Sequence, residues 1–265
     1  MVWRWALAAF VLLLQAGYAA GQPLAVQGGP WRLEGRVYES AHLSAHPHLI
    51  LVLHGDAPFE NPSYHYVFAR RAAEALADTV AVGLLRPGYK DGLGGRSQGI
   101  RGWTNGDNYT RDTVADIAAA ARALVQRYRA GDLTLVGHSG GATIAADIAA
   151  LYPHLAKRVL LVSCPCDVTR FRWSMLKLQL NPIWLLPVWS LSPQDYVGQV
   201  PRDTVVRLVV GANDVVAPPP LTFAYADALK RHGGDVAVFV LKDAPHDILL
   251  EPAVLEQLRL LMAAR

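Results

Sequence analysis

Three residues of the kinds that cooperate in nucleophilic catalysis follow three separate apolar runs of the chain. Ser139, Asp214 and His246 each come shortly after a run typical of a buried strand. A serine hydroxyl becomes a useful nucleophile only when a base removes its proton, and a carboxylate in turn orients that base. Because the carboxyl ends of parallel strands meet at one edge of a sheet, the order serine, aspartate, histidine predicts that these side chains meet there. The chemistry would be acyl transfer through the serine.

The serine lies in the sequence Gly-His-Ser-Gly-Gly (137–141), between an apolar run at 133–136 and a helical pattern at 140–151. A strand that turns into a helix through one residue strains the backbone of that residue, and only small neighbours allow so close an approach. The first N–H groups of the helix would point at an anion forming beside the hydroxyl. This pattern favours Ser139 as a nucleophile; the alternative is a tight turn without chemistry.

The other two positions also have alternatives. Asp243 and Asp247 flank His246, and Asp167 follows the strand after the serine helix, so each of these carboxylates could replace Asp214. His246 itself could be a surface histidine at a strand end. If a histidine is the base, activity should rise with pH through the ordinary imidazole range, near a pH of about 6.5.

Apolar runs and helical patterns alternate along the chain after the first thirty or so residues. Apolar strands interrupted by helices predict an α/β fold in which helices cover both faces of a mostly parallel central sheet. The predicted strands are 31–38, 49–53, 80–85, 133–136, 159–162, 205–210 and 236–241, and the predicted helices are 66–76, 113–128, 140–151, 221–232 and 252–262.

Residues 48–262 resemble the α/β-hydrolases, the group that contains esterases, lipases and peptidases. Gly-His-Ser-Gly-Gly is similar to their nucleophile elbow, Gly-Ala-Asn-Asp (211–214) to their acid turn, and Pro-His-Asp (245–247) to their histidine loop. The resemblance implies that Ser139 is the nucleophile, that His246 is the general base and then the general acid, and that Asp214 orients it.

The resemblance also implies an oxyanion hole. His54-Gly55 stands where the family places its oxyanion loop, which implies the backbone N–H groups of Asp56 and Gly140 as donors. The chain lacks the longer His-Gly-Gly-Gly form and has an aspartate where many relatives have an apolar residue. Because a carboxylate would repel an oxyanion, we expect the Asp56 side chain to turn away and bond to a loop N–H or to Arg86.

Two further segments concern the substrate pocket. Arg-Pro-Gly-Tyr (86–89) resembles a family segment that shapes the pocket floor, which implies Tyr89 as a lining residue. The insertion 164–203, rich in tryptophan and leucine, stands where the family usually has a cap over the active site. Its candidate pocket residues are Trp173, Trp184 and Trp189; the alternative is that they belong to the core.

The N-terminus has the pattern of a secretory signal: Arg4, an apolar run at 5–14 and small residues at 16–21. We expect residues 1–21 to be a signal peptide, cleaved between Ala19 and Gln22, and residues 22–265 to form one hydrolase domain. The apolar run is shorter than a spanning helix of about 20 residues, so no membrane span should remain after cleavage. An uncleaved anchor is the alternative.

Composition and net charge narrow the possible ligands and partners of the protein. The net charge is +3 and the basic residues are scattered, which excludes a nucleic-acid footprint. The only two cysteines, in Cys164-Pro165-Cys166, are expected to be ordinary thiols, because a bridge would close a tight ring. A histidine cluster at 42–48 has no acidic or cysteine ligand beside it, so no metal and no cofactor are expected.

The sequence therefore predicts a secreted or periplasmic serine hydrolase that cleaves a small-molecule carboxylic ester (EC 3.1.1), with an apolar or aromatic acyl group, through an acyl-enzyme on Ser139. One alternative is a serine exopeptidase, which usually needs acidic cap residues to hold a substrate amine; this cap offers only Asp167, Asp195 and Asp203. The other is a catalytically silent hydrolase-fold protein that binds an apolar ligand. The sequence predicts no oligomeric state.

Overall fold

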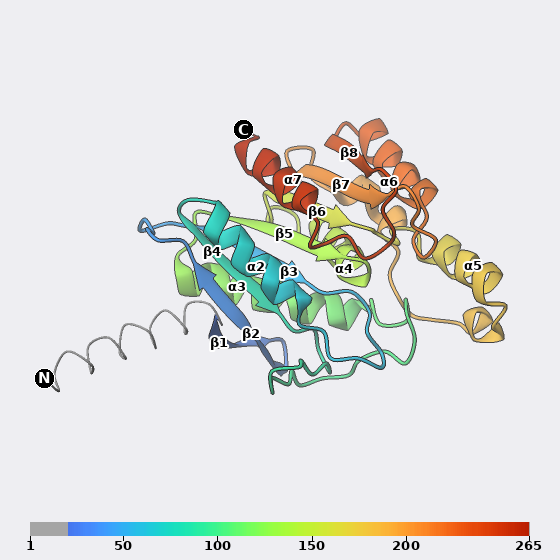
Figure 1. Cartoon of the computed structure of the whole chain (residues 1–265), viewed down its shortest axis with the longest axis horizontal. Coiled ribbons are helices and arrows are strands. Elements are labelled where there is room, and N and C mark those ends of the chain that lie inside the picture. The colour runs from blue at the N-terminus through green and yellow to red at the C-terminus, as the bar shows by residue number, and fades with distance from the viewer. Residues whose placement is uncertain (1–20, 265) are drawn as a thin grey trace, which may run out of the picture.

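The computed structural model describes residues 21–264 (Figure 1). The predicted signal peptide therefore lies outside the described residues, apart from Gly21 at its end. Between residues 21 and 264, no helix has the length and apolar character that crossing a bilayer requires.

A central sheet of eight strands has the order β1-β2-β4-β3-β5-β6-β7-β8. Strand β2 runs antiparallel to its neighbours β1 and β4, and the remaining pairs are parallel. The mostly parallel α/β sheet predicted from the sequence is thus confirmed. The strands are β1 Gln22–Gly28, β2 Trp31–Glu39, β3 His48–Leu53, β4 Thr79–Leu84, β5 Asp132–His138, β6 Arg158–Val162, β7 Val205–Gly211 and β8 Asp235–Leu241.

Helices cover both faces of the sheet (Figure 1). Helices α2 and α7 pack on one face, and α3, α4 and α6 pack on the other. Helix α5 and the short 3₁₀ helices η1 and η2 lie between β6 and β7 in the chain. The helices are α2 Tyr64–Ala75, α3 Arg111–Tyr128, α4 Gly140–Leu151, α5 Val168–Gln179, η1 Pro182–Leu185, η2 Pro193–Gln199, α6 Pro219–Arg231 and α7 Pro252–Ala263.

Strand β3 shows why the strands are apolar throughout. Its side chains alternate between the two faces, so Leu49, Leu51 and Leu53 join the core under α3 and α4, while Ile50 and Val52 join the core under α2 and α7. All five are fully buried. A strand buried on both faces needs apolar residues at every position, and its carboxyl end can then hold polar loops rigidly.

The prediction missed the first strand. Strand β1 pairs antiparallel with β2 along its whole length, so β1 and not the segment 31–38 forms this edge of the sheet. Leu24 and Val26 point inward, but the run is short and contains Pro23, which resembles a loop. Proline is tolerated here because an edge strand has one row of N–H groups without a strand partner.

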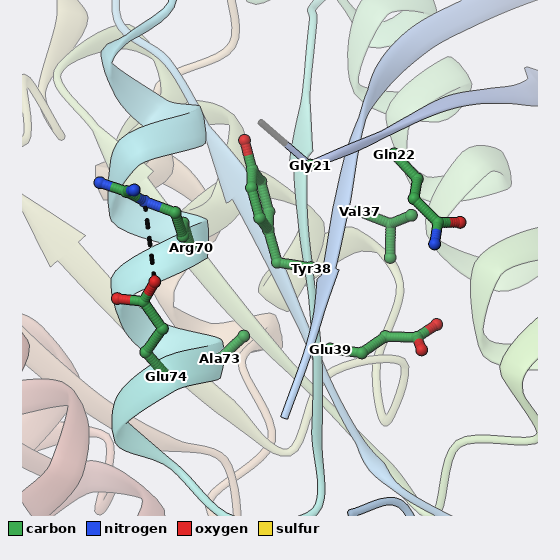
Figure 2. Close-up of a pocket in the computed structure, with 8 residues that line it drawn as sticks. All are labelled: Gly21, Gln22, Val37, Tyr38, Glu39, Arg70, Ala73 and Glu74. Carbon is green, nitrogen blue, oxygen red and sulfur yellow. Dashed lines mark ion pairs between the residues drawn. The ribbon is translucent and has the colours of Figure 1, made fainter. Parts of the chain in front are cut away.

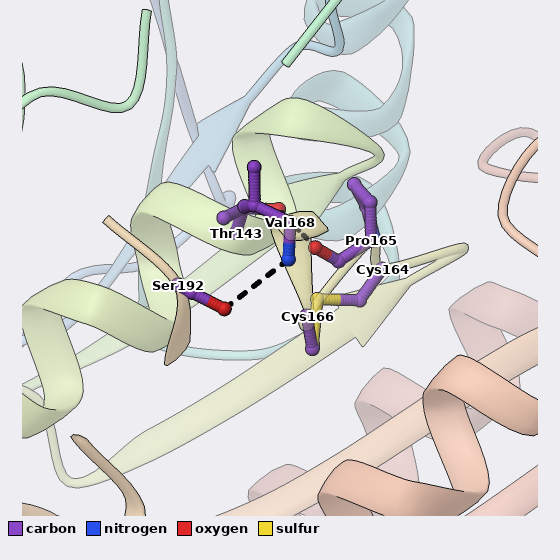
Figure 3. Close-up of a disulfide and its surroundings, with 6 residues drawn as sticks. All are labelled: Thr143, Cys164, Pro165, Cys166, Val168 and Ser192. Atoms are coloured by element: carbon purple, nitrogen blue, oxygen red, sulfur yellow. Dashed lines mark hydrogen bonds between the residues drawn. A yellow bond between two sulfur atoms is a disulfide. The ribbon is translucent and has the colours of Figure 1, made fainter. Parts of the chain in front are cut away.

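The expectation that the two cysteines are free thiols is wrong. Cys164 and Cys166 form a disulfide, with 5.1 Å between their Cα atoms, where thiols were expected (Figure 3). The ring lies at the end of β6, where the buried Pro165 carbonyl accepts a hydrogen bond of 3.4 Å from Thr143 Oγ1 on α4. Two residues later, Val168 N donates to Ser192 Oγ at 3.1 Å. The disulfide therefore fixes the point at which the chain leaves the sheet to form α5.

Only part of the 164–203 insertion covers apolar surface. Phe171, Met175 and Trp184 form a small core with Leu221 of α6. Other large apolar side chains of the insertion are exposed: Trp173, Leu178, Leu180, Leu185, Leu186 and Trp189.

Candidate active site

Ser139 occupies a sharp turn between β5 and α4. Its φ of 51° and ψ of −122° are a strained combination for a residue with a side chain. A Cβ on Gly137 would lie 2.3 Å from the Gly141 carbonyl oxygen, and one on Gly141 would lie 2.5 Å from the oxygens of Leu53 and His54. The glycines are therefore required by the close approach of β5, α4 and β3, as the sequence pattern predicts.

The structure brings Ser139, His246 and Asp214 together in one hydrogen-bonded chain. His246 Nε2 lies 2.9 Å from Ser139 Oγ, and His246 Nδ1 lies 2.8 Å from Asp214 Oδ2. Asp214 is buried, and its other oxygen accepts hydrogen bonds from the N–H groups of Val216 and Ala217 at 2.9 and 2.8 Å. The carboxylate is thus held on both sides, with one oxygen facing the imidazole.

Backbone contacts between the ends of β7 and β8 explain how residues 32 positions apart meet. Asn213 N donates to the Ala244 carbonyl at 2.9 Å. A Cβ on Gly211 would lie 2.1 Å from the Pro245 oxygen, so the close packing of the two loops depends on this glycine. The acid turn and the histidine loop, which we define as residues 242–247, therefore form one unit.

The alternative acids do not face the Nδ1 atom of His246. Asp167 accepts a hydrogen bond from Arg170 N as the N-cap of α5, and the Asp247 side chain is 90% exposed. Asp214 is the carboxylate in hydrogen-bond contact with that nitrogen.

One group among the described residues has the spacing of metal ligands: His138, His246 and Asp247, with donor atoms within 4.8 Å of one another. Both ring nitrogens of each histidine already have hydrogen-bond partners. In the earlier histidine cluster, His48 Nδ1 lies 2.9 Å from Asp132 and His46 Nδ1 lies 3.0 Å from the Arg129 carbonyl.

Residues 54–58, which we call the oxyanion loop, pass directly beside Ser139. His54 Nδ1 donates to the Gly55 carbonyl at 2.7 Å, and His54 Nε2 accepts from Arg86 N at 3.1 Å. The Gly55 carbonyl and the Asp56 N–H belong to one planar peptide and point in opposite directions, so His54 also fixes the direction of that N–H. Burial lowers the pKa of His54 well below its ordinary value, which keeps the ring neutral.

The Asp56 carboxylate turns away from the serine hydroxyl into a buried network, as its charge requires. Its Oδ1 lies 2.8 Å from Arg86 Nη1, and its Oδ2 accepts from Gly106 N at 2.8 Å and from the Tyr109 hydroxyl. The Arg86 guanidinium also lies over the rings of Tyr89 and Tyr109, at 5.2 and 5.7 Å. Arg86 therefore neutralises the negative charge of the Asp56 carboxylate, which lies near the place where an oxyanion would form.

Replacing Arg86 by methionine should lower the free energy of unfolding by about 3–5 kcal/mol, because both partners of the pair are buried and the carboxylate would lose its counter-charge. Urea denaturation measures this change. The double variant Asp56→Asn/Arg86→Met should recover part of the loss. If Arg86→Met costs no more than a surface substitution, Arg86 does not neutralise Asp56.

A pocket of about 570 Å³ opens beside Ser139 and His246. Its apolar walls come from the oxyanion loop and the residue after it, the 100–109 loop, the insertion and the segment that follows the acid turn. They include Phe59, Trp103, Phe171, Ile183, Trp184 and Val216. Trp184 Nε1 donates to Gln179 Oε1 at 2.9 Å, and the Trp184 ring packs edge-on against Phe171 at 6.0 Å. The prediction that Trp184 lines the pocket is thus supported by its position.

The other predicted pocket residues lie elsewhere. Trp173 and Trp189 are 54% and 82% exposed and are not among the lining residues. Tyr89 is buried behind the oxyanion loop, where its ring packs edge-on against His54 at 4.6 Å. Tyr89 therefore packs against the oxyanion loop from the core side and does not reach the pocket.

A second hollow of about 50 Å³ lies between β2 and α2 (Figure 2). It has room for only one or two water molecules. Tyr38 and the Arg70–Glu74 ion pair border it, near the N-terminal end of β4. It is therefore at the opposite end of the sheet from the serine turn, and we assign it no part in the site.

Two residues to which the sequence assigned no role in the site, Tyr64 and His138, also line the pocket. Tyr64 begins α2, and its hydroxyl contacts both the oxyanion loop and His138. No motif marks Tyr64, since its place beside the site depends on how α2 packs against β3 and β4.

The sheet order, the serine turn and the position of the insertion define the fold of the α/β-hydrolases. A family model described as serine aminopeptidase, S33, matches residues 91–206, a segment that contains Ser139 but neither Asp214 nor His246. Comparison with curated proteins yields no match.

Three solved structures illustrate the likeness. An esterase of Pyrococcus furiosus aligns with a TM-score of 0.66 and 14% identity, over 91% of this chain and 90% of its own. Est1E of Butyrivibrio proteoclasticus aligns with a TM-score of 0.67 and 14% identity, over 92% of this chain and 100% of its own. An acylaminoacyl peptidase of Pyrococcus horikoshii aligns with a TM-score of 0.69 and 14% identity, over 91% of this chain and 40% of its own. At this identity the likeness establishes the fold alone.

Proposed function

We propose that the protein is a serine hydrolase that cleaves a carboxylic ester through an acyl-enzyme on Ser139. The observation that carries the proposal is the chain of two hydrogen bonds, 2.9 and 2.8 Å long, from Ser139 through His246 to Asp214. Such a chain on a strained strand-to-helix turn is the arrangement that activates a serine hydroxyl.

In the first half of the reaction, the Ser139 oxygen attacks the ester carbonyl while its proton moves to His246 Nε2. The new oxyanion accepts hydrogen bonds from the N–H groups of Asp56 and Gly140, which have no acceptor among the described residues. The C–O bond then breaks, and the Nε2 proton goes to the leaving alcohol. In the second half, water gives a proton to His246 and attacks the acyl carbon. The bond between the acyl carbon and the Ser139 oxygen then breaks, the acid leaves, and His246 returns the proton to Ser139.

The pocket walls support an apolar or aromatic acyl group. Trp184, Phe171 and Ile183 offer flat and aliphatic surface beside Ser139. Est1E, which shares the fold, has been solved with ferulic acid bound, and that ligand is an aromatic acid.

Replacing Trp184 by alanine should lower kcat/KM for an aromatic acyl ester by about 10–100-fold, because the transition state loses an apolar wall. The same change should affect p-nitrophenyl acetate much less, since its acyl group does not reach that wall. Trp189→Ala removes an equally large side chain that is exposed and outside the pocket, and it is the matched control. Equal losses for both esters would show that Trp184 does not select the acyl group.

A serine aminopeptidase is the second candidate, because the matching family model has that description. The cap acids that could hold a substrate amine, Asp167, Asp195 and Asp203, are not among the pocket-lining residues, although Glu60 and Asp247 are. Parallel assays with p-nitrophenyl acetate and amino-acid p-nitroanilides separate the two activities.

We also propose that the protein acts outside the cytoplasm, after cleavage of the N-terminal signal. The Cys164–Cys166 disulfide supports this, because disulfides persist mainly in oxidising compartments.

The test of the hydrolase proposal is to map a fluorophosphonate probe on the purified mature protein by mass spectrometry. The probe captures a serine that its neighbours already activate, so we expect labelling at Ser139. A folded protein that is not labelled would favour the silent, ligand-binding alternative.

A further inference from the structure

Two side chains connect the oxyanion loop to the histidine loop. The Tyr64 hydroxyl lies 2.6 Å from the Gly55 nitrogen and 2.8 Å from His138 Nδ1. His138 Nε2 lies 3.2 Å from the main-chain carbonyl oxygen of His246, which Ser163 Oγ also contacts at 2.7 Å. The connection therefore runs from the residue before Asp56 to the backbone of the proposed base.

The direction of each hydrogen bond in this chain is determined by the groups at its ends. The His246 carbonyl can only accept, so His138 carries its proton on Nε2 and has a lone pair on Nδ1. The Gly55 N–H can only donate, so the Tyr64 oxygen accepts there and its own proton goes to His138 Nδ1. For a neutral His138 ring, no other direction of the hydrogen bonds satisfies both ends.

The surroundings of His138 and Tyr64 keep both side chains in the protonation states that this chain requires. Burial, together with the smaller effect of the nearby His246, lowers the pKa of His138 to about 4. Burial also raises the pKa of the Tyr64 hydroxyl, which therefore keeps its proton. Asp247 lies 3.9 Å from His138 Nε2, but its side chain is 90% exposed to water, which screens its charge.

The groups that form this hydrogen-bonded chain are closely packed. A Cβ on Gly55 would lie 3.0 Å from Ser139 Cβ, 3.1 Å from the Tyr64 hydroxyl and 3.3 Å from His138 Nδ1. The tyrosine and histidine rings meet edge to face, with 5.4 Å between their centroids. The Tyr64 hydroxyl is therefore held closely between the oxyanion loop and the His138 ring.

We propose that Tyr64 and His138 are positioning residues, which hold the oxyanion loop and the histidine loop at a fixed separation through one hydrogen-bonded chain. This inference rests on the function proposed above. In the transition state the oxyanion and the protonated His246 form at the same time, so an error in either position reduces the rate. Tyr64 and His138 need not contact the substrate to have this effect.

The first test is Tyr64→Phe, which removes only the hydroxyl. We expect kcat for p-nitrophenyl acetate to fall by about 10–100-fold, with KM changed by no more than about twofold, because an oxyanion-hole donor is displaced while the pocket walls remain. Affinity for a boronic acid, which forms a tetrahedral adduct with the serine, should fall in parallel with kcat.

Tyr66→Phe is the matched control. Tyr66 lies on the same helix, is buried, and donates its hydroxyl to Asp91 at 2.8 Å, away from the pocket. Tyr64→Phe loses two hydrogen bonds and Tyr66→Phe loses one, so both variants should lose stability, but only Tyr64→Phe should lose kcat. At the other end of the chain, His138→Gln can still donate to the His246 carbonyl and should retain more activity than His138→Leu.

Fluorophosphonate labelling of the wild-type protein distinguishes a failure of this inference from a failure of the proposed function. If the wild type labels at Ser139 and Tyr64→Phe keeps its kcat and boronate affinity, the inference is overturned and the proposed function stands. If the wild type does not label, the proposed function fails and this inference fails with it. If Tyr64→Phe does not fold, nitrogen NMR of the wild-type protein decides, because a His138 tautomer with its proton on Nδ1 contradicts the chain.

Discussion

Ser139→Ala should lower kcat for ester hydrolysis by about 10⁶-fold, since the loss of the nucleophile removes the benefit of the whole triad. His246 Nε2 would have no hydroxyl to deprotonate, although the imidazole and Asp214 would stay in place. Activity measured with p-nitrophenyl acetate, together with fluorophosphonate labelling, gives the result. Residual kcat within about tenfold of the wild type would remove Ser139 from the mechanism.

The strained backbone at Ser139 also leads to a prediction about stability at the same position. Alanine keeps the strain of a positive φ, which costs about 1–3 kcal/mol, whereas glycine relieves it. Ser139→Gly should therefore be as inactive as Ser139→Ala and have a higher thermal midpoint. If both variants have the same thermal midpoint, the positive φ at residue 139 does not destabilise the fold.

The sequence predicted the sheet and the triad because those features depend on local patterns. A strand buried on both faces must be apolar throughout, and a turn as tight as that at Ser139 requires glycine on either side. Asp214 and His246 were predicted to lie beside Ser139 because each follows a strand, and parallel strands bring their carboxyl ends together.

The parts that were missed depend on contacts between distant segments. Trp173, Trp184 and Trp189 have the same chemistry, and only the packing of α5 and η1 decides that Trp184 faces the pocket. Tyr89 follows a family motif, but it turns inward to pack against His54. The disulfide was missed because the sequence shows the short spacing but not the 5.1 Å separation of the Cα atoms at the end of β6.

The elements that join the active-site loops were the hardest to foresee. The chain from Gly55 through Tyr64 and His138 to His246 uses residues from four segments, and Tyr64 lies in no recognisable motif. The groups at the two ends of this chain, the Gly55 N–H and the His246 carbonyl, belong to the backbone and leave no mark on the sequence. The positions of the candidate triad residues were therefore predictable, whereas the contacts that hold them in place were not.

Asp214→Asn should lower kcat by about 10⁴-fold, the effect of the same change in a serine protease triad. The structure gives a specific reason. The Val216 and Ala217 N–H groups donate to one oxygen of Asp214, and in the variant they would hold the amide oxygen in that place. The amide NH₂ would then face His246 Nδ1 and favour the tautomer with its proton on Nε2, which cannot accept the proton of Ser139.

Asp243→Asn and Asp247→Asn are the controls, because these carboxylates flank the same histidine without contacting Nδ1. Both variants should keep kcat within about threefold of the wild type, since surface charges act weakly on a group that already has a buried partner. If Asp247→Asn instead showed the large loss while Asp214→Asn did not, the orienting carboxylate would have been assigned wrongly. Nitrogen NMR of His246 in Asp214→Asn tests the cause directly, because the argument requires the proton to have moved from Nδ1 to Nε2 while the fold is unchanged.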